Sequence, residues 1–474
     1  MSTGIALPPA LVEELRSIVG TPNVLFAEED LLAYAYDGTW YESRPLVVVL
    51  PDNRDQISAI HRVASREKLA ITPRAMGSGL SGGAVPLAGS ILLNVMRMNR
   101  IIEIDEINHV AVVGPGVINA DLQKAVEARG LFYPPDPSSL RQSAIGGNVA
   151  ENAGGARCLK YGVTGDYVAA LEVVLPGGEI IRCGGKMVKN VTGYDLRALF
   201  TGSEGTLGTV TEITLRLLPK PKFSLTATAA FDHIEDAAAC VTRVMASGLL
   251  PTSIELLDQL TMRCVEDFRT CGLPSDAAAL LLFACDGNHE QIIRGEIEEI
   301  GEVAIACKAR GIRVAADAIE SARLWDGRRS IAPALARRRP HRLGEDISVP
   351  RSALVEMVCR VHEIADRHRL EIPIYGHAGD GNLHPNILCD RSNGEEMLRV
   401  REAAREIFET AIALGGTLSG EHGIGLLKKQ FMEMDLGIPT LALMRRIKDA
   451  IDPLGIMNPG KIFPEPGGVD AFRL

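Results

Sequence analysis

Apolar and polar residues follow one another in short runs along the first 220 positions, and these runs predict more strands than helices. Residues 45–51 form a β-branched run bounded by prolines, which predicts a buried strand, and residues 55–66 carry apolar side chains at helical spacing. Runs of the same kinds predict strands at 69–73, 91–95 and 110–113 and helices at 9–19 and 119–129. A strand-rich region with few helices is typical of an α+β domain.

From residue 223 onwards the pattern changes to strand, helix, strand, and the same order then occurs again. Strands are predicted at 224–231, 253–257, 280–285 and 313–316, and helices at 234–246 and 289–309. This repeat predicts a compact sheet with helices on one face, and it places a domain boundary near Pro219–Pro221. Later helices are predicted at 324–337, 352–367, 394–414 and 440–451.

The composition of the 474 residues is that of a globular, multi-domain protein, because 46% are hydrophobic and 23% are charged. The net charge of −10 argues against nucleic acid or an anionic membrane as a partner, since both require a basic surface. One local exception is the group Arg337, Arg338, Arg339 and Arg342. It is interpreted as a solvated loop held open by Pro340, with a docking patch or an anion-attracting rim as the alternatives.

The cysteines do not indicate a thiolate-bound metal, and the apolar runs do not indicate a membrane span. The nine cysteines are scattered without a Cys-x-x-Cys pair, which excludes the usual local zinc and iron–sulfur spacings and indicates reduced, buried thiols. The longest apolar run, 277–285, is too short to cross a bilayer, so no transmembrane segment is expected. A cytoplasmic protein is therefore expected, with peripheral contact to a membrane only through a partner.

A glycine-rich loop follows the strand predicted at 69–73. Residues 77–82 match the G-x-G-x-x-G pattern of a dinucleotide site, and Glu103 lies at a plausible distance for a ribose-binding acid. The glycines and the proline within 83–89, however, leave no room for a helix before the strand at 91–95. The loop is therefore predicted to join strand to strand, with successive backbone N–H groups rather than a helix dipole around a pyrophosphate.

Three further segments are rich in small or rigid residues. Residues 133–139 form a proline-containing polar turn, residues 144–155 would let backbone press against a flat ring, and residues 202–208 repeat the glycine-rich theme. Each segment alone could be an ordinary tight turn. Together they favour a large, extended cofactor.

Taken together, residues 73–83, 133–139, 145–155 and 202–208 resemble the FAD-binding domain of the vanillyl-alcohol oxidase (PCMH-type) flavoproteins. Within that superfamily the chain resembles the group that contains the glycolate oxidase flavin subunit, D-lactate dehydrogenases and D-2-hydroxyglutarate dehydrogenase. The likeness covers roughly residues 40–465. It implies an FAD-dependent oxidoreductase, and since the loop at 77–83 contains no His or Cys, the FAD is expected to be bound without a covalent link.

The resemblance also implies the architecture and the cofactor contacts. The expected fold is α+β: a PCMH-type FAD-binding domain of two α/β subdomains, a ferredoxin-like cap domain, and a C-terminal helical segment that returns to the flavin. The corresponding ranges are 1–40 for an N-terminal helical segment, 41–220 for the FAD-binding domain, 221–412 for the substrate or cap domain, and 413–474 for the C-terminal segment. The residues expected to contact FAD are Arg74, Gly77, Ser78, Gly79, Leu80, Ser81, Gly82, Pro135, Asp136, Ser138, Ser139, Gly146, Gly147, Asn148, Asn152, Gly154, Gly155, Glu204, Val210 and Asn458.

Two glycine-rich segments in the C-terminal half, 375–386 and 415–425, carry the remaining candidate chemistry. His377 and His384 with Glu421 would make a set of two imidazoles and one carboxylate, which suits Zn²⁺, Mn²⁺ or Fe²⁺. A lone His is more often a hydrogen-bonded structural residue, and the spacing of the two histidines is not that of a helical metal site. The metal role is therefore implied by the resemblance, in which the matching positions bind a divalent ion.

Oxidation of a 2-hydroxy acid requires removal of the hydroxyl proton and transfer of a hydride from C2 to the flavin. A divalent cation would acidify the hydroxyl, and His422 is the candidate base, with a hydrogen bond that steadies Glu421 as its alternative role. Arg328 matches the family's substrate arginine, with Arg329 as the second choice, and Asn386 is expected to donate a hydrogen bond to the substrate. Three other histidines lie on predicted amphipathic helices and are expected at the surface: His61, His362 and His368.

The substrate is expected to be a small acid. D-2-Hydroxyglutarate dehydrogenases hold the distal carboxylate with a Thr and a Lys, and Ala332 and Gly344 align with these positions. The difference favours D-lactate or glycolate, with D-2-hydroxyglutarate as the alternative substrate. As a dehydrogenase the protein would pass electrons to a partner, either an iron–sulfur subunit or an electron-transferring flavoprotein.

Three other functions are less consistent with the sequence. A non-catalytic FAD electron-relay subunit would not need the His, Glu and Arg set, and a zinc hydrolase would leave the N-terminal half unexplained. An oxidase that uses O₂ differs from a dehydrogenase only in access to the flavin, and the residues do not distinguish the two.

Overall fold

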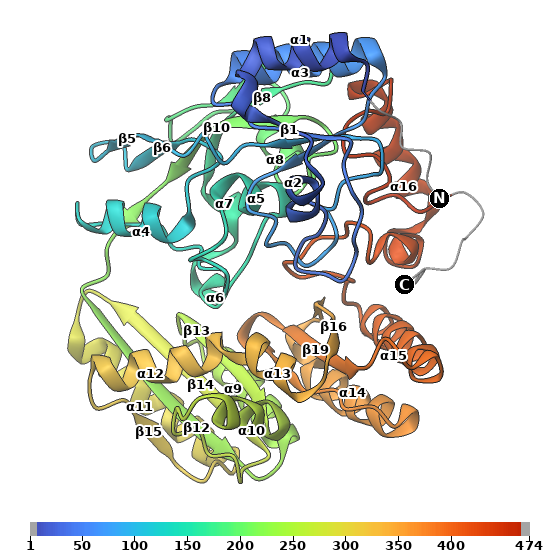
Figure 1. Ribbon diagram of the computed structural model, residues 1–474. Coiled ribbons are helices and arrows are strands. Elements are labelled where there is room, and N and C mark those ends of the chain that lie inside the picture. Colours follow the sequence, from blue (N-terminus) through green and yellow to red (C-terminus); the bar gives the residue numbers. More distant parts are fainter. Residues whose placement is uncertain (1–6, 466–474) are drawn as a thin grey trace. The chain divides into compact units, whose positions relative to one another are not determined.

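The computed structural model describes residues 7–465, and they form two compact units (Figure 1). The first unit contains residues up to Gly154, Val163–Lys220 and the chain from Glu421 onwards. The second unit contains Gly155–Gly162 and Pro221–Gly420. No helix among the described residues is long and apolar enough to cross a membrane.

The first unit is built on two main sheets. A mixed four-stranded sheet has the order β1 (Val24–Leu25), β2 (Val47–Val49), β4 (Ile91–Asn94) and β3 (Ile71–Arg74), with β2, β4 and β3 parallel. An antiparallel five-stranded sheet has the order β5 (Ile101–Asp105), β6 (Val110–Val113), β10 (Thr209–Arg216), β8 (Val168–Val174) and β9 (Ile180–Gly184). A two-stranded sheet joins β7 (Leu131–Phe132) to β11 (Leu218–Pro219).

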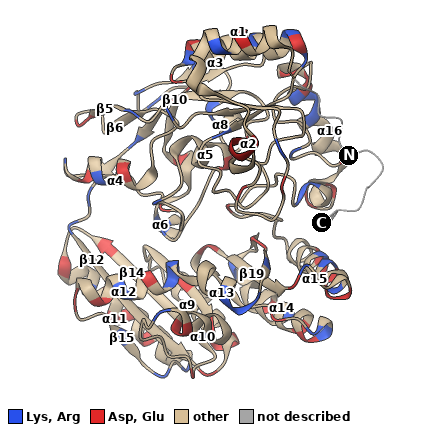
Figure 2. Ribbon diagram, in the orientation of Figure 1, with Lys and Arg blue, Asp and Glu red and all other residues tan. Residues whose placement is uncertain are grey.

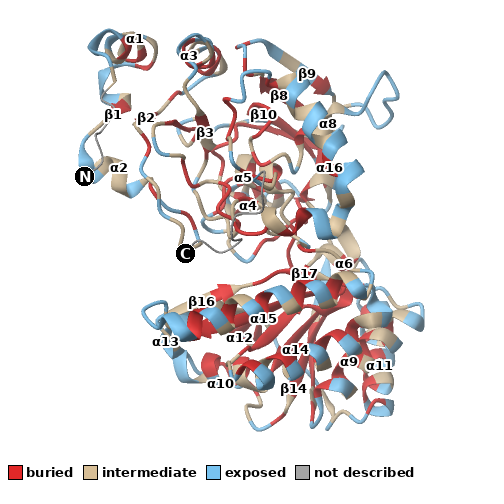
Figure 3. Ribbon diagram, turned by 90° about the vertical axis from the view of Figure 1, so that its right-hand side faces the viewer, coloured by how far each residue is buried: buried red, intermediate tan, exposed pale blue. Residues whose placement is uncertain are grey.

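The helices of this unit are α1 (Pro9–Val19), α2 (Glu28–Ala33), α3 (Arg54–Glu67), α4 (Asn119–Glu127), α5 (Ile145–Glu151), α7 (Thr164–Tyr167), α8 (Leu196–Phe200) and α16 (Met432–Ile451). Helices α1 and α3 lie side by side in Figures 1 and 3 and pack with the parallel strands into one core. Asn53 caps α3 by accepting a hydrogen bond from the Gln56 amide. Because helices cover the sheet, β2 is buried throughout, as its β-branched run predicts.

The second unit is built on a sheet with the order β15 (Ile312–Val314), β12 (Phe223–Phe231), β14 (Ala279–Gly287), β13 (Ser253–Asp258), β18 (Ile374–His377), β19 (Asn382–Cys389) and β16 (His341–Gly344), and β17 (Ile347–Ser348) also pairs with β19. Its helices are α6 (Cys158–Tyr161), α9 (Ile234–Ala246), α10 (Gln259–Phe268), α11 (Glu290–Ala306), α12 (Ala318–Arg329), α13 (Ile331–Arg338), α14 (Leu354–His368) and α15 (Gly394–Ala413). Figure 3 shows that the strands of this sheet are largely buried.

Helices cover both faces of this sheet, so the predicted one-sided arrangement is wrong. Trp325 of α12 donates a hydrogen bond to Thr226 of β12, which places α12 on one face. On the other face, a Cβ at Gly287 would lie 2.9 Å from Ile293 of α11. The helices from which the arrangement was predicted, α9 and α11, do contact each other. The prediction did not include α10, which packs with α12 and α13 in a second core.

Two histidines that were expected at the surface are buried. His61 is fully buried: one ring nitrogen contacts the carbonyl oxygen of Leu175 and the other contacts the Thr209 hydroxyl. His368, also buried, pairs with Glu406. Acidic and basic residues are interspersed along the helices of each unit (Figure 2).

Candidate active site

The loop between β3 and β4 contains no helix, which confirms the predicted strand–loop–strand arrangement. Gly77 has a φ of +69°, and a Cβ there would overlap the guanidinium of Arg74. Arg74 donates hydrogen bonds to the carbonyl oxygens of Tyr36, at 2.5 Å, and Ala84, at 3.2 Å. Arg74 therefore stabilises the glycine loop from inside.

The second glycine-rich segment forms the short helix α5, which the sequence pattern did not predict. A Cβ at Gly146 would lie 2.6 Å from the Pro115 side chain, so this glycine is explained by helix packing. Asn152 accepts a hydrogen bond from the Gly165 amide, at 2.7 Å, and ends the helix in a left-handed conformation. The buried Nδ2 of Asn148 has no hydrogen-bond partner among residues 7–465.

Glu204 ties the third glycine-rich segment to the chain that follows Gly420. Its carboxylate accepts hydrogen bonds from the amides of Ile424, at 2.8 Å, and Gly425, at 2.7 Å. Burial raises the pKa of Glu204 to about 7, although these amides and Lys461 favour the charged form. The side chain of Glu204 thus holds the segment that carries Glu421 and His422.

Asn458 connects the same loops. Its Nδ2 donates hydrogen bonds to the carbonyl oxygens of Gly83, at 3.0 Å, and Glu204, at 2.7 Å. Its buried Oδ1 has no partner in the described part of the chain. The remaining residues expected at the flavin lie on the β3–β4 loop, between β7 and α5, within α5, after α5 and on β10: Ser78, Gly79, Leu80, Ser81, Gly82, Pro135, Asp136, Ser138, Ser139, Gly147, Gly154, Gly155 and Val210.

These features fit a large cofactor with polar edges. Asn148 and Asn458 each present one buried polar atom that no described residue satisfies, and buried polar groups in proteins normally have partners. The neighbouring loop is open at Gly79, where a Cβ would meet only Glu151, at 3.6 Å. FAD, with its carbonyl, ring-nitrogen and phosphate groups, matches this set of groups.

In the second unit, polar and charged side chains lie in a row on one face of the sheet. Side chains alternate between faces along a strand, and residues that oppose each other on neighbouring strands share a face. Tyr375 pairs with His384, and His377 pairs with Asn382, across β18 and β19. The face that carries His384 therefore also carries Glu255, Tyr375, His377, Asn382, Asn386, Arg342 and Gly344.

Glu255 joins the predicted substrate arginine to a predicted metal ligand. The fully buried carboxylate accepts hydrogen bonds from Arg328 Nε, at 2.5 Å, and from His377 Nδ1, at 2.6 Å. Burial alone would raise the pKa of Glu255, but the charge of Arg328 and the contacts with His377 hold it below its ordinary value. Arg328 lies over the Tyr375 ring, and its buried Nη2 has no partner among the described residues.

Asp346 lies beside His384, as Glu255 lies beside His377. It accepts hydrogen bonds from Asn382 Nδ2 and Ser419 Oγ, each at 2.7 Å, and its Oδ1 lies 3.7 Å from Nδ1 of His384. The sequence analysis assigned a role in the site to neither Asp346 nor Glu255. The signal was present at Glu255, since an acid within the apolar strand at 253–257 is unusual and requires a buried partner.

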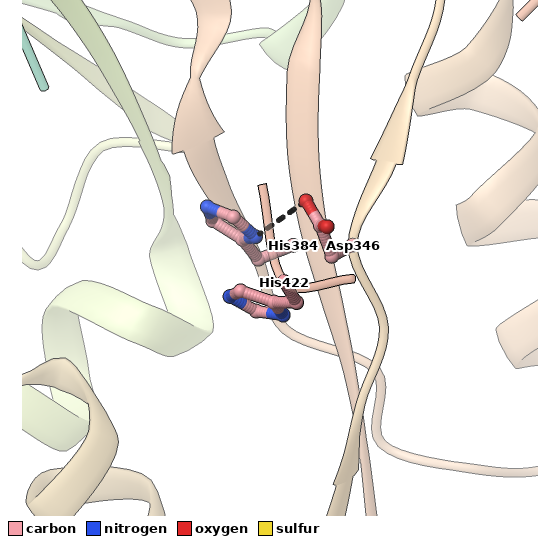
Figure 4. A group of neighbouring side chains, drawn as sticks. All are labelled: Asp346, His384 and His422. Atoms are coloured by element: carbon pink, nitrogen blue, oxygen red, sulfur yellow. Dashed lines mark ion pairs between the residues drawn. The ribbon is translucent and has the colours of Figure 1, made fainter. Parts of the chain in front are cut away.

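The structure brings the three predicted metal ligands together and also offers a second set. Ligand atoms of His377, His384 and Glu421 all lie within 4.8 Å of one another. So do those of Asp346, His384 and His422, which Figure 4 shows with the two imidazoles close to each other. Oε1 of Glu421 lies 3.9 Å from Nε2 of His422. Two imidazoles with one carboxylate suit a divalent transition ion, and both sets use His384.

Asn386 and the arginine-rich stretch have partners in the second unit that the sequence did not indicate. Asn386 Nδ2 donates to the His384 carbonyl oxygen, at 2.9 Å, and Oδ1 accepts from Arg342 Nη1, at 2.7 Å. Arg338 and Arg339 form ion pairs with Glu371 and Glu396. The stretch is therefore not a solvated loop throughout, because α13 ends at Arg338 and β16 follows.

Comparison with known proteins identifies the family of this chain. Residues 220–462 match the family "FAD linked oxidases, C-terminal domain" and residues 45–184 match "FAD binding domain". The chain is 46% identical to glycolate oxidase subunit GlcD of Bacillus subtilis, over 95% of this chain and 96% of the relative. It is 33% identical to a D-lactate dehydrogenase of Anaerostipes hadrus, over 96% and 97% of the two chains.

The fold matches solved structures of two other enzymes. The structure of p-cresol methylhydroxylase with bound substrate aligns with a TM-score of 0.79 at 19% identity, over 96% of each chain. That of alkyldihydroxyacetonephosphate synthase aligns with a TM-score of 0.76 at 17% identity, over 97% of this chain and 87% of the other. The predicted α+β flavoprotein fold and the FAD cofactor are confirmed, and the chain belongs to the FAD-linked oxidases.

Proposed function

We propose that this protein is an FAD-dependent dehydrogenase that oxidises a small D-2-hydroxy acid, D-lactate or glycolate, to the 2-oxo acid. The observation that carries the proposal is the sheet face that carries His377 and His384, with Arg328 of α12 bonded to Glu255 on the same face and Glu421 and His422 near the imidazoles. Relatives named glycolate oxidase subunit and D-lactate dehydrogenase support this substrate class.

Each residue has a defined task in this reaction. Arg328 binds the substrate carboxylate through its unsatisfied Nη2, and Glu255 fixes the orientation of the guanidinium. His422 accepts the proton of the C2 hydroxyl. Asn386 contacts Arg342 and the His384 backbone in the structure and supports the substrate side of the site. FAD, when bound, supplies the acceptor for the hydride that leaves C2.

A divalent ion fits the proposed reaction. His377, His384 and Glu421 would hold it, and the ion would make the substrate hydroxyl more acidic. His377 donates its Nδ1 hydrogen to Glu255, which leaves Nε2 with a lone pair for a ligand bond. The second set, with Asp346 and His422, is the competing arrangement, in which His422 would be a ligand instead of the base.

The electrons are proposed to pass to a partner protein, either an iron–sulfur subunit or an electron-transferring flavoprotein. Two relatives are named subunits of glycolate oxidase, which supports an assembly with a second protein. The test is to replace the partner with an artificial dye and then with O₂. Full turnover with O₂ alone would contradict the need for a partner.

The deciding experiment is anaerobic bleaching of the flavin absorbance. Purified holoenzyme is mixed with D-lactate, L-lactate, glycolate or D-2-hydroxyglutarate, before and after treatment with a chelator. The proposal predicts rapid bleaching by D-lactate or glycolate, loss after chelation, and recovery with a divalent ion. Absence of bleaching with all four acids would overturn the proposed function.

A further inference from the structure

Arg342 lies on the candidate active-site face of the second unit, at the edge opposite Arg328. It belongs to β16, whose residue Gly344 opposes Asn386 of β19. Since side chains two residues apart share a face, Arg342 lies on the same face as Asn386 and His384. In the order of the sheet, β18 and β19, which carry the two histidines, lie between β13 and β16. Strand β13 carries Glu255, the partner of Arg328.

The guanidinium of Arg342 is held in place by an amide. Nη1 donates to Asn386 Oδ1, at 2.7 Å, and Asn386 is only 1% exposed. The orientation of that amide is itself fixed, because Nδ2 donates to the His384 carbonyl oxygen. Gly344 allows this pair to approach the strand closely, since a Cβ there would lie only 3.0 Å from Asn386 Oδ1.

Arg342 differs from its neighbours in having no carboxylate partner. Arg338 and Arg339 pair with Glu371 and Glu396 at 2.5 Å each. Arg342 is half-buried, and within residues 7–465 its guanidinium makes a hydrogen bond to Asn386 but no ion pair. A partly buried guanidinium whose charge is uncompensated attracts an anionic ligand, and its planar fork fits a carboxylate.

Arg328 and Arg342 cannot bind the same carboxylate of a substrate. Arg328 is fixed by Glu255 and the Tyr375 ring, and Arg342 is fixed by Asn386. Three strand spacings, about 14 Å, separate β13 from β16, and the two side chains reach inward from these opposite sides. A substrate held by Arg328 through its first carboxylate would therefore present its other end to Arg342.

We infer that Arg342 is a second anion-binding position of this site, which extends the substrate class to 2-hydroxy acids that carry a second carboxylate. The inference rests on the proposed function. Ala332 and Gly344, which align with the distal-acid residues of D-2-hydroxyglutarate dehydrogenases, supply no charge. Arg342, two residues before Gly344 and on the same face, supplies the positive charge.

The test compares monocarboxylic and dicarboxylic substrates in matched variants of the holoenzyme. Anaerobic flavin reduction is measured with D-lactate, D-malate and D-2-hydroxyglutarate for the wild type, R342M, R342K and the control R338M, which removes a charge whose ion pair is with Glu371. In R342M the KM for the dicarboxylates is expected to rise about 10- to 100-fold relative to that for D-lactate. R342K should give a smaller rise, because it keeps the charge but loses the fork.

Binding of products gives a readout that does not depend on turnover. The Kd of 2-oxoglutarate should rise in R342M by the same factor relative to that of pyruvate, while R338M should resemble the wild type. An equal loss for D-lactate and the dicarboxylates would overturn the inference, because Arg342 would then bind the first carboxylate. Reduction by D-lactate with no binding of any dicarboxylate would also overturn it, whereas no reduction by any acid would overturn the proposed function itself.

Discussion

The carboxylate of Glu255 accepts a hydrogen bond from Nδ1 of His377, at 2.6 Å, and the same carboxylate accepts a second one from Arg328, at 2.5 Å. One buried acid thus orients an expected metal ligand and the expected substrate arginine. All three residues come from different elements, β13, β18 and α12. A change at Glu255 should therefore affect metal binding and substrate binding together.

The variant E255Q tests this coupling. Glutamine cannot accept charge-assisted bonds from both partners, so the affinity for Zn²⁺ or Mn²⁺ is expected to fall about 10- to 100-fold. The KM for D-lactate should rise as well, because Arg328 loses its orientation. Metal affinity is measured by competition with a chelating dye. As the control, E371Q removes an acid from an exposed ion pair, and equal metal affinity in E255Q and E371Q would contradict the role of Glu255.

The role of His422 is tested by H422N. If His422 is the base, FAD and metal content should remain normal, while the rate of flavin reduction falls by a factor of about 100 or more. Stopped-flow bleaching measures the rate, and elemental analysis measures the metal. Loss of the metal would instead favour the set of Asp346, His384 and His422. A normal rate would exclude both roles.

Glu204 is expected to position His422 through the backbone. Its carboxylate accepts hydrogen bonds from Ile424 and Gly425, and in E204Q one of these charge-assisted contacts is weakened. We expect normal FAD content but flavin reduction slower by about 10-fold, since loss of one such bond costs about 1–3 kcal/mol. Absorbance gives the flavin content and stopped flow gives the rate. If E204Q lost FAD and recovered its full rate with added FAD, Glu204 would act on the cofactor, as the sequence predicted.

The sequence predicted the local features of the fold well. Helix α9 occupies the predicted range 234–246, and the strand–loop–strand arrangement around Gly77 followed from glycines and a proline that exclude a helix. Helices α5 and α10 and strands β18 and β19 were not predicted. The glycines and histidines of β18 and β19 obscure the pattern of apolar residues that indicates a strand. These residues have a weak intrinsic preference for strands, but burial of the two strands between their neighbours outweighs it.

The residues missed at the site share a physical cause. Glu255 and His377 lie 122 positions apart, and Ser419 lies 73 positions from Asp346, so only the folded chain reveals these pairs. A sequence motif can reveal titratable residues only when they lie next to one another in the chain, as Glu421 and His422 do. Partners supplied by distant strands have no motif.

The openness of the flavin loop can be tested at Gly79. A Cβ at this position would make ordinary contact with Glu151, at 3.6 Å, so the loop itself tolerates a side chain. The branched side chain of G79V extends further along the loop and should prevent FAD binding without unfolding the protein. Flavin absorbance and the thermal midpoint of the apoprotein check this, with G295A as the control, since nothing lies within 4 Å of a Cβ at that helical glycine. FAD retained at full occupancy in G79V would place the cofactor elsewhere.

The buried His61 predicts a loss of stability in acid. Burial lowers the pKa of His61 to about 4 from an ordinary value of 6.5, because neither ring nitrogen is solvated, although the hydrogen bond to the Leu175 carbonyl favours the protonated form. The folded state therefore binds the proton less readily than the unfolded state, so the stability from neutral His61 is present above pH 6.5 and is lost as the pH falls towards 4. The loss amounts to up to about 3 kcal/mol. Thermal midpoints of the wild type and H61Q across this range measure it; H61Q should be less stable at pH 7 but flatter in its pH dependence, and parallel curves would show that another group controls acid unfolding.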